Sequence, residues 1–411
     1  PGLNSAAIEE FIDIDTAVIG GGAAALWLTN VLRQKGFSTV LLTNSDLGVG
    51  QSLAAQGVIH SGVKYLGLFG KSNDSAQELK AMPRIWRGCL AGETDLDEGQ
   101  IKLEGVEVLS KVQHLWSPPG FFNRIAAGFS RRGLRGNAKA INRSEFPEPF
   151  DHSKYDGQVA EIDEPVLNPR SITEALTKGI EDCVYRVDNP EFLVESGRLI
   201  GVRIGNQTIR ARRWVLAAGA GNGAIVERIG IAEIRMQRRP LHQIVIRSEK
   251  LPPMFSVCLP SWVNCLKAIP KRALPKPVVV ITTHEDSQGR RLWYVGGDLA
   301  ETSGRSEGEQ VEIAKSRFQQ LLPWVDFSGA EWSAFKIDRA EPEAGGKERP
   351  SGAFCETHEN VSVAWPTKLA LIPDLAKKLL SEISRAGLTP QNPQPELELP
   401  RPAIGRSPWD S

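Results

Sequence analysis

Residues 15–42 read DTAVIGGGAAALWLTNVLRQKGFSTVLL, and this stretch decides the fold class. Its opening letters, DTAVI, favour a β-strand and run directly into three consecutive glycines. In the residues after the glycines, the spacing of Ala24 and Leu28 puts both on one face of a predicted helix, and Gly36 then ends that helix. The closing letters, STVLL, are typical of a second, fully buried strand. We therefore predict a βαβ unit over residues 13–45.

The triple glycine carries the spacing of a dinucleotide-binding turn. Gly20, Gly22 and Ala25 form the pattern G-x-G-x-x-A between the predicted strand and the predicted helix. The first glycine permits the tight turn, the second lets a pyrophosphate approach the backbone, and the alanine allows close packing of helix on sheet. The phosphates would lie at the positive end of the helix.

One element of that pattern is altered at the end of the second strand. An acidic residue that binds a ribose hydroxyl is expected there, about 20 positions after the glycines. This chain has Thr43 and Asn44 instead. We expect one of these two side chains to bind the ribose, or Ser45 or Asp46 to take over that role.

Three further segments indicate a family. Residues 54–66 read AAQGVIHSGVKYL, residues 214–221 read WVLAAGAG and residues 338–346 read DRAEPEAGG. Together with the glycine turn they resemble the D-amino-acid oxidase and glycerol-3-phosphate dehydrogenase superfamily of FAD enzymes. Within it, GVIHSGVKY is most similar to the branch that oxidises L-2-hydroxyglutarate and glycerol-3-phosphate.

The resemblance implies an α/β protein with an FAD-binding Rossmann-like domain and a second, mainly antiparallel-sheet substrate domain. We expect the FAD-binding domain to be discontinuous and to comprise residues 13–75, 158–230 and 335–386. The substrate domain would then comprise residues 76–157 and 231–334. Residues 387–411 contain six prolines and little apolar periodicity, which predicts an extended or disordered tail.

The resemblance also implies which residues contact FAD. Gly20, Gly22 and Ala25 would lie at the pyrophosphate, and Val187 where a backbone group meets the adenine. The contacts around the flavin ring would come from Ser52, Ala54, Gly57 and Val58, and those of the second FAD-contacting strand from Ala218 and Gly219.

Residues 365–368, Trp-Pro-Thr-Lys, stand where the family has a glycine-rich turn beside the ribityl chain and the N1–C2=O edge of the flavin. Because this chain has no glycine there, the resemblance leaves open how closely the backbone at Thr367 approaches the cofactor. Lys368 could compensate, since a cation near N1 favours the negative charge that develops as the flavin takes up a hydride.

His60 is the candidate general base, because oxidation of an alcohol needs a group that accepts the hydroxyl proton and a neutral imidazole is available near pH 7. It lies in a glycine-flanked loop that the resemblance places against the flavin. The alternatives are that His60 only packs against or hydrogen-bonds the flavin, or that it attaches the flavin covalently.

Arg339 is the candidate for substrate binding, because a planar guanidinium pairs with two oxygens of a carboxylate or phosphate at once. A structural ion pair with Glu341 or Glu343 is the alternative. Lys347 and Arg349 could enlarge the cationic site.

Two further residues are candidate substrate contacts. Tyr65, with Lys64, alternates along a strand-like loop and could reach the pocket. His242 precedes a strand and could line the substrate cavity, or lie solvated at the strand edge.

The composition excludes several classes of function. Forty-nine basic and forty-nine acidic residues balance, so no global charge attracts nucleic acid. Five cysteines without a C-x-x-C pair and six histidines without metal-ligand spacing predict no metal site and a reducing, cytoplasmic location. No apolar stretch is long enough to predict a membrane span.

These observations predict an FAD-dependent enzyme that transfers a hydride to the flavin from a small anionic 2-hydroxy acid or a related polyol phosphate. An FAD-dependent amino acid oxidase or dehydrogenase is the second hypothesis. A non-catalytic flavin-binding accessory protein is a third, and an NAD-dependent dehydrogenase a fourth. No residue indicates the electron acceptor.

Overall fold

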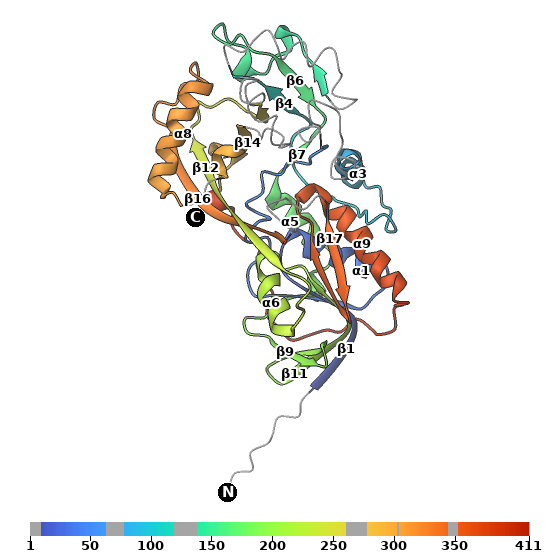
Figure 1. Ribbon diagram of the computed structural model, residues 1–411. Helices are drawn as coiled ribbons and strands as arrows, with labels where there is room; N and C mark the ends of the chain where they lie inside the picture. The colour runs from blue at the N-terminus through green and yellow to red at the C-terminus, as the bar shows by residue number, and fades with distance from the viewer. Residues whose placement is uncertain are drawn as a thin grey trace.

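Two sheets of eight strands each organise the chain in the computed structural model. The structure describes residues 10–62, 78–118, 138–259, 278–301, 304–343 and 352–410. Figure 1 shows the two sheets in separate lobes, with β12 (Met236–Arg247) and β16 (Glu331–Pro342) running from the upper lobe down to the lower one.

The first sheet is built around β1 (Glu10–Ile19), which pairs in parallel with β2 (Thr39–Thr43) on one side and β11 (Gln207–Leu216) on the other. Two outer strands, β8 (Val184–Arg186) and β18 (Val361–Trp365), continue the parallel order. The antiparallel strands of this sheet are β9 (Glu191–Glu195), β10 (Arg198–Ile204) and β17 (Phe354–His358). The carboxyl ends of the parallel strands therefore meet at one edge, where α/β sheets bind ligands.

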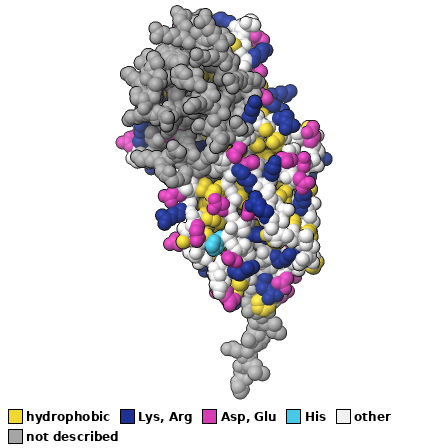
Figure 2. Space-filling view, turned by 45° about the vertical axis from the view of Figure 1, so that its right-hand side comes forward, with side chains coloured by type: hydrophobic (Ala, Val, Ile, Leu, Met, Phe, Trp, Pro, Cys, Tyr) yellow, Lys and Arg dark blue, Asp and Glu magenta, His cyan; other side chains and the backbone are white. Residues whose placement is uncertain are grey.

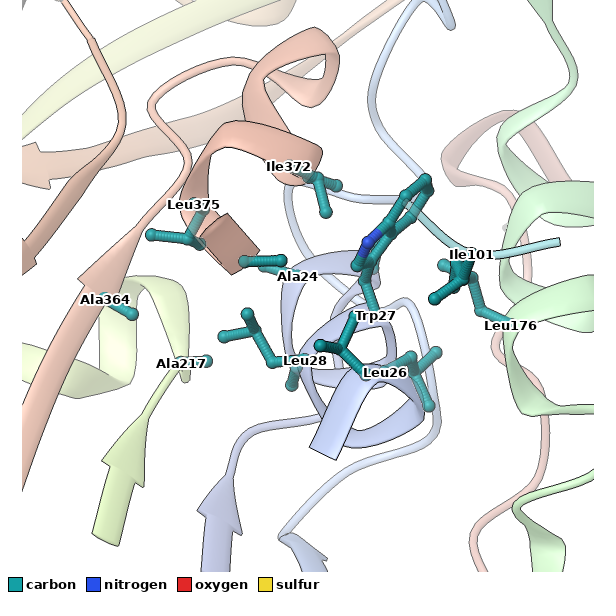
Figure 3. Packing of buried hydrophobic residues seen from close by; sticks show 14 of the residues in the cluster. Ala24, Leu26, Trp27, Leu28, Ile101, Leu176, Ala217, Ala364, Ile372 and Leu375 are labelled. Carbon is teal, nitrogen blue, oxygen red and sulfur yellow. The ribbon is translucent and has the colours of Figure 1, made fainter. Parts of the chain in front are cut away.

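The predicted βαβ unit is present. Helix α1 (Ala23–Gln34) follows the glycine turn, and Gly36 ends it in a left-handed conformation, with φ of 86°. The side chain of Trp27 is fully buried and its indole donates to the Gly99 carbonyl at 2.8 Å. Figure 3 shows Trp27 beside Ile372 and Ile101 in the core that α1 forms.

The remaining helices cover the sheets. The core with α1 includes side chains of α3 (Met82–Leu90), α5 (Pro169–Thr177) and α9 (Ile372–Arg385), and a separate core of the same sheet includes α6 (Asn222–Ile229). In the upper lobe, α8 (Glu307–Leu321) packs on the second sheet and begins at a capping box of Ser306 and Glu309.

The second sheet has the strand order β16-β12-β15-β14-β13-β4-β6-β5. Its further strands are β4 (Gln113–Trp116), β5 (Ala138–Ala140), β6 (Val159–Ile162), β13 (Ser256–Cys258), β14 (Val279–Glu285) and β15 (Arg291–Gly296). A small ladder joins β3 (Val108–Ser110) to β7 (Val166–Leu167). The pairing in the second sheet is antiparallel except between β4 and β13, so the expected α/β class with a mainly antiparallel second sheet is confirmed.

Residues 388–407 are mainly extended and lie against the protein, and Pro408–Asp410 form a short 3-10 helix, η9. The fully buried carboxylate of Asp15 accepts hydrogen bonds from the backbone of Gln391 and Asn392 at 3.1 and 3.2 Å. Burial alone would raise the pKa of Asp15, but backbone hydrogen bonds from Ser38 and these two residues lower it below 3.8. At the far end Trp409 packs on Tyr294, so this segment joins the two lobes.

Candidate active site

A cavity of about 1180 Å³ lies between the carboxyl ends of the parallel strands and the facing surface of β12 and β16. Most of the residues named from the sequence line it. They are Gly20, Gly22, Thr43, Asn44, Ser52, Ala54, Gly57, Val58, His60, Val187, Ala218, Gly219, Arg339, Thr367 and Lys368. The fold thus brings together residues that are more than 340 positions apart in the chain.

The glycine turn has the shape of a phosphate cradle. Gly20 has φ of 135°, and a Cβ there would collide with the Ala217 carbonyl. A Cβ at Gly22 would lie 2.9 Å from the Ser52 hydroxyl, which itself accepts from the Ala23 amide at 2.9 Å. Gly20 therefore lets the chain turn tightly against the end of β11, and Gly22 leaves space beside Ser52 at the start of α1. Ala25 is fully buried against the core and does not line the cavity, in keeping with a packing role.

At the end of β2, Thr43 and Asn44 differ in what they offer a ligand. The hydroxyl of Thr43 donates to the Ser45 carbonyl at 3.2 Å and accepts from the Ser45 amide at 3.3 Å, so it is engaged in a local turn. Asn44 is exposed in the cavity. Asp188, which sequence reasoning missed, also lines the cavity just beyond β8, the strand beside β2.

The loop after β2 is held by backbone contacts with β7. Gly57 has φ of 75°, and a Cβ there would collide with the Leu167 carbonyl. The Leu167 amide donates to the Gly57 carbonyl at 2.9 Å, and Val58 bridges to Val166. The resemblance predicts that Gly57 lies against the flavin ring. In the structure Gly57 lines the cavity, and the backbone that requires a glycine at this position is that of β7.

His60 is oriented by a carboxylate. Its Nδ1 lies 3.2 Å from Glu164 Oε2, and the other oxygen of Glu164 accepts from the Ser61 amide at 2.8 Å and the Ser61 hydroxyl at 2.9 Å. Glu164 is fully buried, whereas the His60 side chain is 19% exposed and lines the cavity. Two donors from Ser61 favour an ionised Glu164, which makes Nδ1 the protonated nitrogen and leaves Nε2 as the basic one.

Arg339 faces the cavity from β16, directly opposite Arg239 of β12. Glu341, one suggested partner of Arg339, is bound by Arg239 at 2.5 and 3.1 Å and by Gln237 at 2.9 Å. Burial raises the pKa of Tyr294, and the charge of Arg339 partly offsets this shift, so the guanidinium acts on that ring electrostatically.

The turn at residues 365–368 keeps a glycine-like backbone without a glycine. Thr367 has φ of 59°, in the left-handed region, and its hydroxyl donates to the Gly352 carbonyl at 3.0 Å. The indole of Trp365 donates to the Gly219 carbonyl at 3.0 Å. All four residues, including Lys368, line the cavity.

Of the candidate substrate contacts, His242 lies away from the cavity and Tyr65 lies outside the described residues. His242 is 1% exposed and is not among the residues that line the cavity. Burial and then the charge of Lys336, the residue opposite on β16, lower the pKa of His242. His242 is therefore neither a contact in the cavity nor a solvated residue at the strand edge. Tyr65 and Lys64 lie outside the described residues, as do Lys347 and Arg349.

The described part of the chain contains no cluster of three or more His, Cys, Asp or Glu side chains suited to a metal ion. None of its helices combines the length and apolar character needed to cross a bilayer. On the face seen in Figure 2, acidic and basic side chains are interspersed over the coloured lower part.

Comparison with known proteins identifies the family. The family model described as FAD dependent oxidoreductase matches residues 15–350. The chain belongs to this family. The oxidoreductase is 35% identical over 401 residues to the probable FAD-dependent oxidoreductase PA4991 of Pseudomonas aeruginosa, covering 97% of this chain and 98% of that protein.

Solved structures resemble the oxidoreductase along nearly its whole length. The crystal structure of PA4991 aligns with a TM-score of 0.81 at 32% identity, over 98% of this chain and 99% of that one. A glycine oxidase from Geobacillus kaustophilus aligns with a TM-score of 0.62 at 15% identity, over 93% and 97%. An L-alpha-glycerophosphate oxidase from Mycoplasma pneumoniae, solved with FAD bound, gives 0.60 at 12%, over 90% and 95%. At such low identity the last two show the fold alone.

The oxidoreductase is therefore an FAD-dependent enzyme, which confirms the predicted cofactor and the predicted oxidoreductase activity. The glycine turn at the start of α1 fits a pyrophosphate, since Gly20 and Gly22 line the cavity there and a side chain at Gly22 would occupy the space beside the Ser52 hydroxyl. The narrower resemblance to the L-2-hydroxyglutarate branch is not decided by these relatives.

Proposed function

We propose that the oxidoreductase oxidises a small anionic substrate, a 2-hydroxy acid, a related polyol phosphate or the corresponding amino acid, at the carbon beside the anionic group. The observation that carries this proposal is that Arg339 and His60, which is hydrogen-bonded to the buried Glu164, line the same cavity as the glycine turn. Bound FAD supplies the hydride acceptor. The protein supplies an anion site, a base and an enclosed space.

In this proposal Arg339 binds the carboxylate or phosphate. A guanidinium can donate two parallel hydrogen bonds to such a group, which fixes its orientation as well as its position. Arg239, opposite, is held by Glu341 and adds positive potential without being the anchor.

His60 is the proposed base. Its Nε2 accepts the proton of the substrate hydroxyl, or of the ammonium group in an amino acid, and Glu164 stabilises the imidazolium that forms. Since the same base serves both substrates, this pair does not choose between them. Lys368 would hold a positive charge in the part of the cavity assigned to the cofactor.

Anaerobic bleaching of the flavin absorption band tests the proposal. The purified protein is mixed with matched pairs of 2-hydroxy and 2-amino acids, and with glycerol-3-phosphate. We expect at least one of these compounds to bleach the wild-type protein. Arg339→Ala should raise the substrate concentration needed by roughly 100-fold, and Arg339→Lys by less, because a lysine keeps the charge but not the paired donors. A coloured protein that no anionic compound bleaches, or equal behaviour of Arg339→Ala and wild type, would contradict the assignment.

A further inference from the structure

Two glutamine side chains line the cavity and present carbonyl oxygens to the same small space. Gln56 comes from the loop after β2, and Gln243 from β12. A Cβ built at Gly296 of β15 would lie 2.7 Å from Gln56 Oε1 and 3.3 Å from Gln243 Oε1. Both oxygens therefore converge over Gly296, where the missing side chain leaves room for them.

The orientation of the Gln56 amide is fixed by its nitrogen. Nε2 donates to the carbonyls of Val280 and Tyr294, both at 3.0 Å. These two bonds use both N–H groups, so the oxygen atom of this amide is the one that points toward Gly296.

Gln243 is 6% exposed, and within the described chain no protein group donates a hydrogen bond to its Oε1. A buried acceptor without a donor destabilises the folded protein, and most buried polar groups in native proteins have a partner. Because this side chain lines the cavity, a ligand can supply the donor.

The position of Gln243 on the sheet places it with the anion site. Arg239 and Gln243 are four residues apart on β12 and so share a face, and Arg339 lies opposite Arg239. Arg339, Gln56 and Gln243 all line the same cavity.

We propose that Gln243, together with Gln56, determines substrate specificity by accepting hydrogen bonds from an N–H group of the substrate, so that the enzyme prefers an amine to a hydroxyl or a second carboxylate. This inference rests on the proposed function, because it needs an anionic substrate at Arg339. An ammonium group offers three hydrogen-bond donors, a hydroxyl only one and a carboxylate none. Two converging acceptors therefore favour an ammonium group over a hydroxyl, and a hydroxyl over a carboxylate. This order reverses the preference for hydroxy acids that the sequence suggests.

The test uses four carboxylates that carry no hydrogen on the carbon beside the carboxylate, so none can be oxidised there. They are 2-aminoisobutyrate, 2-hydroxyisobutyrate, pivalate and 2,2-dimethylmalonate, which differ only in one substituent. Their dissociation constants are measured by calorimetry on the FAD-loaded protein, with acetate as a small reference. We expect 2-aminoisobutyrate to bind tightest and dimethylmalonate weakest.

The variant Gln243→Leu should weaken 2-aminoisobutyrate about tenfold and leave pivalate unchanged, because only the former loses a charge-assisted hydrogen bond. Gln113→Leu is the matched control. Gln113 is also a buried glutamine whose amide atoms have no partner in the described chain, but it does not line the cavity. If Gln243→Leu fails to fold, Gln243→Glu serves instead, and should bind 2-aminoisobutyrate more tightly and dimethylmalonate less tightly.

The outcomes separate this inference from the proposed function. If the wild type binds none of the five compounds, the anion site and the proposed function are both wrong. If the compounds bind and Arg339→Ala weakens all of them, but Gln243→Leu changes none or all equally, the specificity role is overturned while the proposed function stands. Tight binding of dimethylmalonate that depends on Gln243 would also overturn it, since the amide would then be donating.

Discussion

Replacing Glu164 by Gln removes the charge that orients and supports His60 while keeping the shape of the side chain. Once His60 has accepted a proton, its attraction to Glu164 across 3.2 Å is about 5 kcal/mol at an effective dielectric constant of about 20. Glutamine keeps a neutral hydrogen bond, and the 19% exposure of His60 allows screening. We therefore expect a loss of about 2 kcal/mol, or roughly 30-fold in the rate of anaerobic flavin bleaching.

A double-mutant cycle with His60→Ala shows whether Glu164 acts through the histidine. His60→Ala should slow bleaching and leave the flavin colour intact. The addition of Glu164→Gln to this variant should then cost nothing more, because the partner is already missing. Ser61→Ala, which removes one hydrogen bond to Glu164 but no charge, is the control and should cost less than tenfold. If Glu164→Gln slows the His60→Ala variant by a further 30-fold, the two residues act independently and the claim that Glu164 acts through His60 is refuted.

Three further predictions concern stability and the cofactor cradle. Gly57→Ala should lower the free energy of unfolding by more than about 3 kcal/mol, because the new Cβ would collide with the Leu167 carbonyl. Gly50→Ala is the control, since Gly50 also has a positive φ but lies in open space, and it should lower that free energy by about 1 kcal/mol. Equal shifts of the melting temperature in the two variants would contradict this prediction. Asp15→Asn should lower the free energy of unfolding by about 3 kcal/mol at pH 7. The difference should shrink as the pH falls below the unfolded-state pKa near 3.8 and through the lower folded-state pKa, because protonation then removes the same charge from the wild type. A difference in chemical unfolding that does not change with pH would refute the role of that carboxylate. Gly22→Val should abolish FAD retention on gel filtration without unfolding the protein, and a variant that stays yellow would show that the cradle is not needed.

The sequence predicted those parts of the fold that depend on local pattern. The strand, glycine turn, helix and second strand of residues 13–45 follow from short-range periodicity and turn chemistry, and α1 begins and β2 ends within a residue of their expected positions. Helices α8 and α9 carry the same kind of local signal, since their buried side chains recur at helical spacing.

The residues that complete the site lie far apart in the chain, and no local sequence pattern predicts their contacts. Glu164 orients His60 from 104 residues away, and it follows a short strand without any motif around it. The convergence of Gln56 and Gln243 depends on the register of β12 against β15 and on the absence of a side chain at Gly296. Only the assembled sheets bring these groups together.

The C-terminal segment shows the same limit. Six prolines predict an extended chain, but composition does not show that its backbone amides bind Asp15, 376 and 377 residues earlier. His242 was misplaced for a related reason. A histidine ahead of an apolar run has no feature that tells which face of the sheet it takes, and register alone put it opposite Lys336, away from the cavity.

A crystal structure of the purified protein with FAD tests the central claim most directly. The account predicts density for the pyrophosphate against Gly20–Gly22 and the start of α1, with the flavin ring in the part of the cavity that His60 and Lys368 line. A flavin bound anywhere else, or a cavity that stays without a nucleotide after soaking with FAD, would contradict it.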